Sequence, residues 1–512
     1  MRGVDAVLGD AGLRLGDLLA EQARARPDAP ALVAGGLSWT YAELAARADA
    51  AARFLAARGV RAGDRVMVVQ ENAPAAIALF FGALALDAWA APVNARLTAH
   101  EVAAITGLCV PRLVVHLPGL SAQAAAHAAG AERIAHPELG ALAVEGPLPA
   151  APEGAGLPAA EQVAALVFTS GSTGRPKAVM LTHRNMAFNA AVVARERRYA
   201  PADRVYGIAP LTHSLGLGAI LLPTLYAGGV FEVVQRLDLR DLADAVTRRG
   251  VTVLNGPPAL YVRIMEHAGR DGGVDLRRTG LRLLGVGSAP LDPALKRRIE
   301  DAFGLPLHNG YGVTEAGPSI AFSRPGDPAP GLSVGPPLPF VEARVADPDC
   351  REVPRRAEGE LLVRGPGVML GYYRDPEATA AAFAPGPGRW LRTGDVAAQD
   401  VAGNLSILGR SKELIIRGGF NVYPAEIENL LNAQAGVALS AVVGREAGSD
   451  EEIVAFVEPR PGGTPPDPAG LAAALAERLA PYKRPSRIVL VEQLPTSPTG
   501  KVLKGRLAEP GR

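Results

Sequence analysis

In the first two thirds of the chain, short apolar runs alternate with longer segments that have apolar residues at helical spacing. The run Arg65–Val69 predicts a buried strand, and Pro74–Leu86 predicts the helix after it. Two Ala-rich helices are predicted at Leu18–Arg26 and Tyr41–Arg58. Further strand–helix pairs are predicted at Ala165–Phe168 with Asn185–Arg195, Arg204–Ile208 with Leu215–Ala227, Thr252–Leu254 with Ala259–His267, and Leu283–Val286 with Pro293–Phe303. This alternation is typical of an α/β fold with largely parallel sheets, helices on both faces, and ligands beyond the carboxyl ends of the strands.

The pattern changes twice further along the chain. From about Ser333, short strands separated by Gly/Pro turns predict a β-rich subdomain. After Gly409 the pattern predicts a small α+β unit with its own core. We therefore expect two domains, residues 1–408 and 409–512. Residues 130–161 are rich in Ala, Pro and Gly, and we expect them at the surface.

The composition excludes several classes of protein. Hydrophobic residues make up 48% and charged residues 21% of the 512 residues, which suits a folded chain with buried cores. The 53 basic and 52 acidic side chains leave a net charge of +1, so no nucleic-acid partner is expected. Two cysteines cannot build a disulfide framework or a four-thiolate zinc site, so a reducing, cytoplasmic location is expected.

Two segments bear on targeting and membranes. Residues 1–13 lack the basic start and apolar centre of a signal peptide. The segment Val205–Phe231 has no formally charged side chain and is long enough to span a bilayer. Its prolines, its glycines and its polar run Thr212–Ser214 would interrupt a lipid-facing helix. We therefore expect strand, loop and buried helix there, and no membrane span.

The most informative stretch is LVFTSGSTGRPKAVMLTH, at residues 166–183. A predicted strand runs directly into a loop of hydroxyl side chains and glycines, followed by Pro176 and Lys177. Backbone amides exposed at glycines, hydroxyls and a lysine together suit the oxygens of a phosphate chain. No Gly-Lys-Ser/Thr closes the loop, so it is not a Walker A motif. By composition alone, a plain Gly/Ser turn fits as well.

Four further stretches place suitable chemistry on loops. In NGYGVTE, at 309–315, Tyr311 offers a face for a purine, Thr314 a hydroxyl for phosphate and Glu315 a carboxylate for Mg²⁺. In WLRTGD, at 390–395, the carboxylate of Asp395 suits the two hydroxyls of a ribose. The third stretch combines GRSKE, at 409–413, with GGFN, at 418–421, and these two segments flank the domain boundary. The fourth is PTSPTGK, at 495–501, which ends at Lys501. Taken singly, each stretch is equally compatible with a turn or a solvated side chain.

Together and in this order, the five motifs resemble those of the adenylate-forming superfamily of acyl-CoA synthetases, amino-acid adenylation domains and beetle luciferases. The resemblance covers about Leu15 to Leu507 and is strongest to the acyl-CoA synthetases. It implies an acid–thiol ligase that uses ATP and Mg²⁺ to make an acyl-adenylate, releases pyrophosphate, and passes the acyl group to coenzyme A with release of AMP. It also implies a large N-terminal domain and a small, mobile C-terminal domain, with a monocarboxylic acid and CoA as the small-molecule partners.

The resemblance assigns roles to individual residues of this chain. The implied catalytic residues are Lys501, His213, Thr314 and Glu315, with Glu315 as the Mg²⁺ ligand and Thr314 on the α-phosphate. The implied phosphate loop is Thr169, Ser170, Gly171, Ser172, Thr173, Gly174 and Lys177. The implied contacts to adenine, acyl group and ribose are Gly287, Ser288, Ala289, Asn309, Gly310, Tyr311, Gly312, Asp395 and Arg410. Lys412 falls at the family's hinge, and Gly418 and Gly419 would lie beside the pantetheine.

One residue departs from the family pattern. Ala178 stands where the family usually has glycine after Pro-Lys. The change is harmless if residue 178 has a negative φ, and would strain the loop otherwise.

Three other functions fit less well. An amino-acid adenylation domain would be expected to have an acidic residue within Pro210–Gly218, where this chain has His213 and Ser214. A fatty acyl-AMP ligase would be expected to carry an insertion before the small domain, and here Leu408 runs directly into Gly409. A scaffold protein without activity would be expected to have lost Lys501 or Glu315. Delivery of the acyl group to a carrier protein stays open as the main alternative.

The acid itself is less well defined by the sequence. The expected walls of its pocket are His213, Asn255, Gly287, Gly310 and Val313. Malonate-specific members of the family have an arginine near the position of Gly228, so a dicarboxylate is not expected. A short or medium-chain apolar acid and an aromatic acid both remain open, and the sequence indicates no oligomeric state.

Overall fold

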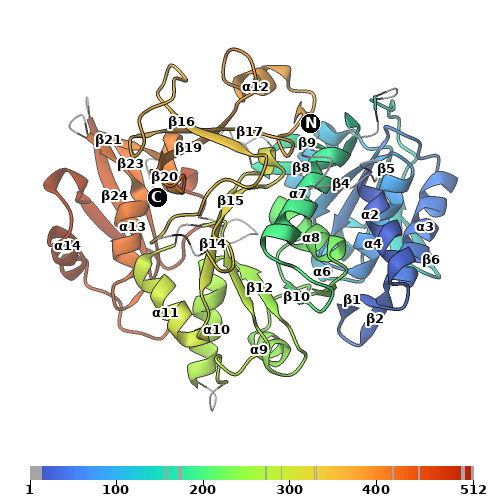
Figure 1. Cartoon of the computed structure of the whole chain (residues 1–512), viewed down its shortest axis with the longest axis horizontal. Coiled ribbons are helices and arrows are strands. Elements are labelled where there is room, and N and C mark those ends of the chain that lie inside the picture. Colours follow the sequence, from blue (N-terminus) through green and yellow to red (C-terminus); the bar gives the residue numbers. More distant parts are fainter. Residues whose placement is uncertain are drawn as a thin grey trace.

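Two eight-stranded sheets form most of the large domain (Figure 1). The structure is a computed structural model that describes residues 14–154, 157–158, 161–170, 176–270, 274–289, 291–327, 329, 331–417, 420–447, 450–496 and 502–508. In the first sheet the strand order is β18-β9-β8-β4-β3-β5-β7-β6. Its strands are β3 Arg65–Gln70, β4 Trp89–Asn94, β5 Leu113–His116, β6 Glu132–His136, β7 Gly140–Glu145, β8 Val163–Ser170, β9 Pro176–Thr182 and β18 Gly371–Tyr372.

The second sheet has the order β15-β14-β13-β12-β10-β11-β1-β2, and the strands from β14 to β1 are parallel to their neighbours. Its strands are β1 Pro30–Ala34, β2 Leu37–Thr40, β10 Arg204–Gly207, β11 Val230–Val233, β12 Val253–Gly256, β13 Leu283–Val286, β14 Leu307–Gly312 and β15 Ser319–Phe322. Because the strands run in parallel, the segments that follow β12, β13 and β14 leave the sheet at the same edge.

Helices cover both faces of each sheet, as the sequence pattern predicts. The layer between the sheets contains α2 Leu15–Ala25, α3 Tyr41–Ala57, α4 Pro74–Ala85, α7 His183–Glu196, the π-helix Leu215–Leu221 and α8 Leu222–Tyr226. The outer face of the first sheet carries α5 Ala99–Cys109 and α6 Ala122–His127. The outer face of the second carries α9 Leu239–Thr247, α10 Pro258–Arg270 and α11 Pro293–Phe303.

Helix α4 shows why the middle layer is closely packed. Its residues from Ala76 to Leu84 are all buried, as expected for a helix that is apolar on every side. A Cβ at Gly82 would lie 2.6 Å from the Cβ of Ala51 on α3, so only glycine permits this approach of the two helices. The main hydrophobic core runs through this layer and joins the two sheets.

The remaining strands form a four-stranded sheet and the small domain. The four-stranded sheet contains β16 Glu342–Ala346, β17 Glu358–Arg364, β19 Leu391–Gln399 and β20 Leu405–Arg410, preceded by the short helix Thr314–Ala316 and interrupted by α12 Pro376–Ala381. The small domain, orange to red in Figure 1, contains the short helix Ser411–Glu413, β21 Ile415–Arg417, β22 Phe420–Val422, α13 Pro424–Asn432, β23 Val437–Ala447, β24 Asp450–Pro459, α14 Pro468–Ala476, the short helix Pro481–Lys483, β25 Arg487–Leu490 and α15 Gly505–Ala508.

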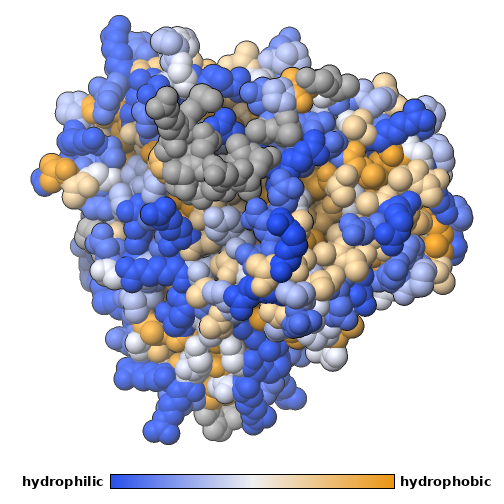
Figure 2. All heavy atoms as spheres, turned by 45° about the vertical axis from the view of Figure 1, so that its right-hand side comes forward, coloured by the Kyte–Doolittle hydropathy of each residue, from blue (hydrophilic) through white to orange (hydrophobic). Residues whose placement is uncertain are grey.

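The structure confirms the α/β fold class and differs from the sequence-based prediction in local detail. The segment Leu215–Leu221 is a π-helix and only Leu222–Tyr226 is α-helical, where one α-helix was expected. Residues 130–161, which were expected at the surface, contain β6 and β7 at the edge of the first sheet, two strands that the sequence analysis did not assign. Figure 2 shows hydrophobic residues gathering mainly to the right of that view, with hydrophilic residues between them. Within the described ranges, no helix is long and apolar enough to cross a membrane.

Candidate active site

Strands β8 and β9 form the hairpin that carries the expected phosphate loop. They pair in antiparallel fashion, with Thr169 opposite Lys177 and Ser170 opposite Pro176. The hairpin therefore holds both ends of the loop together at the end of β8. The expected loop residues Gly171, Ser172, Thr173 and Gly174 lie outside the described residues.

Ala178 lies in β9 opposite Phe168 and is 1% exposed. It has the extended backbone of a strand and is absent from the residues with a positive φ. Its Cβ is part of the core beneath the first sheet. The departure from the family's glycine is therefore harmless, because the backbone conformation at this position suits any residue.

Glu315 is oriented by a tyrosine from a distant part of the chain. The hydroxyl of Tyr372, on β18, donates to Oε1 of Glu315 at 2.9 Å. The backbone N–H of Met369 donates to the carbonyl oxygen of Glu315 at 2.8 Å, so both main chain and side chain are held. Burial, followed by the charge of Glu315, raises the pKa of Tyr372, so its hydroxyl stays protonated and donates.

The same tyrosine ring contacts Lys177, the lysine of the expected phosphate loop. The ammonium nitrogen of Lys177 lies 4.5 Å from the centroid of the Tyr372 ring, a cation–π contact. Tyr372 therefore contacts both this cation, over its ring, and the carboxylate of Glu315, through its hydroxyl, although residues 177, 315 and 372 are far apart in sequence. Mg²⁺ usually binds one or two carboxylates together with substrate phosphates and waters, so a single carboxylate beside the hairpin of the expected phosphate loop fits this ion.

A second cluster joins Tyr311, Asp395 and Arg410. Nε of Arg410 donates to Oδ1 of Asp395 at 2.8 Å, and the two residues face each other across β19 and β20. The Tyr311 hydroxyl donates to Oδ2 of the same carboxylate. Burial and the nearby carboxylate raise the pKa of Tyr311 well above its usual range. The side chain of Asp395 is 4% exposed, so the cluster is almost entirely buried at this carboxylate.

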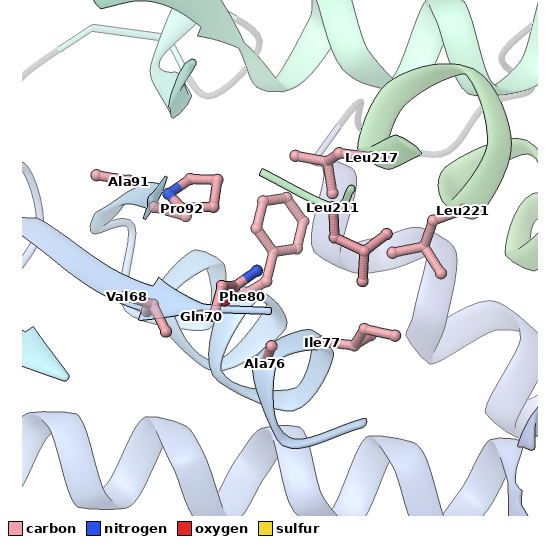
Figure 3. Close-up of a pocket in the computed structure, with 11 residues that line it drawn as sticks. Val68, Gln70, Ala76, Ile77, Phe80, Ala91, Pro92, Leu211, Leu217 and Leu221 are labelled. Carbon is pink, nitrogen blue, oxygen red and sulfur yellow. The ribbon is translucent and has the colours of Figure 1, made fainter. Parts of the chain in front are cut away.

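The segment around His213 contacts the Thr314 loop. The hydroxyls of Ser214 and Thr314 lie 2.8 Å apart, and both side chains are buried. On either side of His213, the side chains of Leu211 and Leu217 point into an apolar cavity whose volume is about 10 Å³, the space of roughly one water molecule (Figure 3). The two leucines therefore anchor the backbone that presents His213.

Close backbone packing explains the glycines of this site. A Cβ at Gly312 would overlap the carbonyl oxygen of Pro318, and a Cβ at Gly287 would lie 3.0 Å from the carbonyl oxygen of Gly310. Ser288 has a φ of 67°, a strained left-handed conformation of the kind found at functional sites. Ala289 follows it in the same turn. The buried amide of Asn309 donates to the carbonyl of Leu332 at 2.9 Å, so it holds a loop of the protein.

The expected hinge follows β20 directly. Lys412 is exposed within the short helix Ser411–Glu413, and the Ser411 hydroxyl donates to the carbonyl oxygen of Gly394 at 3.0 Å. Lys504 forms ion pairs of 2.8 Å with Glu413 and with Glu428. The segment after Lys501 is thereby tied to the start of the small domain. Gly418, Gly419 and Lys501 themselves lie outside the described residues.

The structure overturns one argument about the acid. Gly228 lies in the turn between α8 and β11, and a Cβ there would meet Oε1 of Gln22 at 2.8 Å and Cδ of Arg26 at 3.2 Å. It therefore packs against α2 and away from β12, β13 and β14, which carry the expected acid-pocket residues. The identity of residue 228 says nothing about a second carboxylate on the acid.

Sequence reasoning missed two side chains. Tyr372 lies in a Gly-Tyr-Tyr run without obvious chemistry, and only the pairing of β18 with β9 brings it to Glu315. Arg197 follows α7 as one of many basic residues, but its guanidinium reaches Asn255 on β12. No local pattern distinguishes either residue from its neighbours.

Comparisons with known proteins agree with this arrangement. Residues 19–373 match the family of AMP-binding enzymes, and residues 426–501 match the C-terminal domain of AMP-binding enzymes. A feruloyl-CoA synthase from an Amycolatopsis species is 37% identical over 495 residues, which cover 96% of this chain and 98% of that protein. ATP-bound MatB from Rhodopseudomonas palustris matches with a TM-score of 0.83 at 34% identity, over 96% of this chain and 98% of that one.

A further solved structure contains both expected ligands of the first reaction. The o-succinylbenzoate coenzyme A synthetase from Bacillus subtilis, in complex with ATP and magnesium ion, matches with a TM-score of 0.81 at 27% identity, over 96% of this chain and 98% of that one. The chain therefore belongs to the AMP-binding enzyme family and to the acyl-CoA synthetase branch of the adenylate-forming superfamily. It is an acyl-CoA synthetase, an acid–thiol ligase.

Proposed function

We propose that the protein converts an aromatic carboxylic acid, ATP and coenzyme A to an acyl-CoA, AMP and pyrophosphate. The observation that carries the proposal is the convergence of Lys177, Tyr372 and Glu315 next to the Tyr311–Asp395–Arg410 cluster. One cluster suits phosphates and a divalent cation, and the other suits a nucleoside. The loop from Tyr311 to Glu315 joins them, so a single nucleotide can contact both.

The first half-reaction has to make a carboxylate into an acyl donor. A carboxylate oxygen attacks the α-phosphorus of ATP, the bond to the β-phosphate oxygen breaks, and pyrophosphate leaves with the electron pair. Mg²⁺ held by Glu315 would neutralise phosphate charge. Lys501 is proposed to contact the α-phosphate region during this step, and Thr314 to donate to the same phosphate. Fixed charges and hydrogen bonds of this kind lower the barrier by orienting two anions that repel each other.

In the second half-reaction, the thiol of coenzyme A replaces AMP at the acyl carbon. Gly418 and Gly419 are proposed to lie beside the pantetheine, and His213 is proposed to lie near the acyl carbon and the thiol. Lys412 is the proposed hinge, with residues 1–408 and 409–512 as the two domains. Rotation about a hinge lets one site serve two reactions in turn.

The aromatic character of the acid rests on the relatives and on the strands around the expected pocket. A feruloyl-CoA synthase is among the relatives that this chain matches along almost its whole length. Gly287 and Gly310 are among the residues expected to wall the acid pocket, and neither adds a side chain to that wall. The main alternative is transfer of the acyl group to a carrier-protein thiol, and direct formation of the CoA thioester distinguishes the two.

The experiment is a product analysis with the full-length protein, ATP, Mg²⁺, CoA and a panel of acids. We expect AMP, pyrophosphate and acyl-CoA in equal amounts, and no thioester without Mg²⁺. We expect a cinnamic acid to be used with higher kcat/KM than acetate, malonate or succinate. Formation of ADP and orthophosphate would contradict the mechanism. Acyl-adenylate that accumulates without consumption of CoA would favour the carrier-protein alternative.

A further inference from the structure

The side chain of Arg197 lies on the inner face of the second sheet, in the region expected for the acid. Arg197 is the first residue after α7, and its Nη1 donates to Oδ1 of Asn255 on β12 at 3.3 Å. Its guanidinium carbon lies 4.5 Å from the centroid of the Phe322 ring on β15. The guanidinium group therefore lies over the sheet between a side chain of β12 and a side chain of β15.

Glycines on β13 and β14 make room for this cation. A Cβ at Gly285 would lie 2.6 Å from Nη1 of Arg197, and a Cβ at Gly310 would lie 3.2 Å from Nη2. Asn255 pairs with Gly285, so the two residues share one face of the sheet. Asn255 and Gly310 belong to the residues expected to line the acid pocket, so Arg197 contacts two of its expected walls.

Arg197 has few partners for a buried charge. The side chain is 9% exposed, and no carboxylate among the described residues lies within ion-pairing distance of it. A guanidinium has five N–H donors, whereas the described side chains supply one hydrogen bond, to Asn255, and a cation–π contact. Burial lowers the pKa of Arg197, and the groups that oppose this shift are the phenols of Tyr199 and Tyr261. A buried charge is ordinarily paired with an opposite charge, and among the described residues no carboxylate pairs with this guanidinium.

The distance along the strands fits the far end of an aromatic acid. Gly285 lies on β13 and precedes Gly287, the first residue after that strand, by two residues, and Gly310 precedes Gly312 by two residues on β14. Two residues of a strand span about 7 Å. If the carboxylate lies near Gly287 and Gly312, an acetyl or propionyl group ends before it reaches Arg197. A substituted ring extends to it.

We propose that Arg197 is a specificity-determining residue that binds acceptor oxygens at the far end of the acid. This inference rests on the proposed function, because it assigns a role within the same acid site. The planar fork of two N–H groups suits two neighbouring oxygens, which both a hydroxy-methoxyphenyl ring and an aryl carboxylate provide. Asn255 holds one edge of the fork and thereby fixes its plane.

The test compares three acids that share the cinnamate skeleton and differ only in the substituents at the far end of the ring. The acids are cinnamate, 4-hydroxy-3-methoxycinnamate and 4-carboxycinnamate, and the readout is kcat and KM for pyrophosphate release with ATP, Mg²⁺ and CoA. The variants are Arg197→Met, which removes the charge, and Arg197→Gln, which keeps one donating amide. Arg195→Met is the matched control, because Arg195 is exposed two residues earlier in the chain.

In the wild type, one of the two oxygen-bearing acids should exceed cinnamate in kcat/KM by about 10- to 100-fold, the range for hydrogen bonds to a charged group. Which of them does so identifies the oxygen source as phenol and methoxy groups or as a carboxylate. Arg197→Met should reduce that preference to within about threefold, mainly through KM for the oxygen-bearing acid, and Arg197→Gln should retain part of it. Arg195→Met should keep the full preference.

Two results would overturn the proposal. One is an equal loss for all three acids in folded Arg197→Met, which would show that Arg197 only supports the sheet. The other is a wild-type protein that uses cinnamate with a higher kcat/KM than either oxygen-bearing acid. That result would overturn the proposal even if no Arg197 variant folds. Failure of the proposed function looks different, because then none of the three acids would elicit pyrophosphate release from the wild type.

Discussion

Tyr372→Phe tests whether the hydrogen bond to Glu315 positions the carboxylate for catalysis. The substitution removes one hydroxyl, which donates to Oε1 of Glu315 at 2.9 Å, and keeps the ring beneath Lys177. Hydrogen bonds to charged groups contribute about 1.5–3 kcal/mol. Residues that orient a metal-binding carboxylate typically change metal affinity or activity by about 10- to 100-fold when they are replaced. We therefore expect kcat/KM for adenylation to fall by about 10- to 100-fold.

The assay is pyrophosphate release at a series of Mg²⁺ concentrations, because a loosened Glu315 should shift the half-saturating Mg²⁺ concentration upward. Tyr373→Phe is the matched control. The Tyr373 hydroxyl also donates to a carboxylate, that of Glu153, but its ring packs on Trp89 at a centroid distance of 5.6 Å, away from Glu315. Equal Mg²⁺ dependence in Tyr372→Phe, Tyr373→Phe and wild type would refute the positioning role.

The remaining predictions concern the two half-reactions, one strand residue and one buried histidine. Lys501→Ala should lower acyl-adenylate formation by at least about 10²–10³-fold and spare thioester formation from presynthesised adenylate. Gly419→Leu should block thioester formation and spare acyl-adenylate formation. If each variant lost both half-reactions equally, the alternating-domain mechanism would be excluded. Ala178→Gly should lower the melting temperature, since it deletes a buried methyl and adds backbone freedom at a cost of about 1 kcal/mol or more, while single-turnover adenylation stays unchanged. Burial lowers the pKa of His183 from 6.5 to about 4. Between these pH values the unfolded chain therefore binds more protons at His183 than the folded protein does. The free energy of unfolding should consequently fall as the pH drops from about 6.5 to 4. Thermal melts of His183→Asn, which keeps an acceptor for the Leu15 N–H, should show a weaker pH dependence over this range than wild type does.

The spacing of apolar residues along the chain correctly predicted the alternating strands and helices of the two large sheets. Leu283–Val286 and Pro293–Phe303 are the bounds of β13 and α11, because a short apolar run and a capped amphipathic segment are each specified by their own residues. The π-helix Leu215–Leu221 was not predictable in this way. A Cβ at Gly216 would collide with the carbonyl of Pro210, so the contacts that shape this segment come from the loop before it.

The residues of the candidate site also fall into those that the sequence indicates and those that only the fold reveals. Asp395 and Arg410 follow recognisable motifs, and their meeting depends on the register of β19 with β20, which the sequence does not display. Tyr372 and Arg197 reach the site through strand pairing and through the end of a helix, respectively. Side chains whose chemistry depends on a distant partner are the ones that sequence patterns leave out.

The hydrogen bond from Ser411 to the carbonyl of Gly394 has a consequence for the fate of the intermediate. It fastens the chain to β19 one residue before the proposed hinge, and Asp395 and Arg410 lie on the fastened side. A turn of the small domain about Lys412, the proposed hinge, would therefore leave the contacts proposed for the ribose unbroken. An acyl-adenylate retained through the turn has little opportunity to escape and hydrolyse in solvent. In the proposed alternating-domain mechanism this hydroxyl would help to couple ATP consumption to thioester formation, so we expect Ser411→Ala to release free acyl-adenylate.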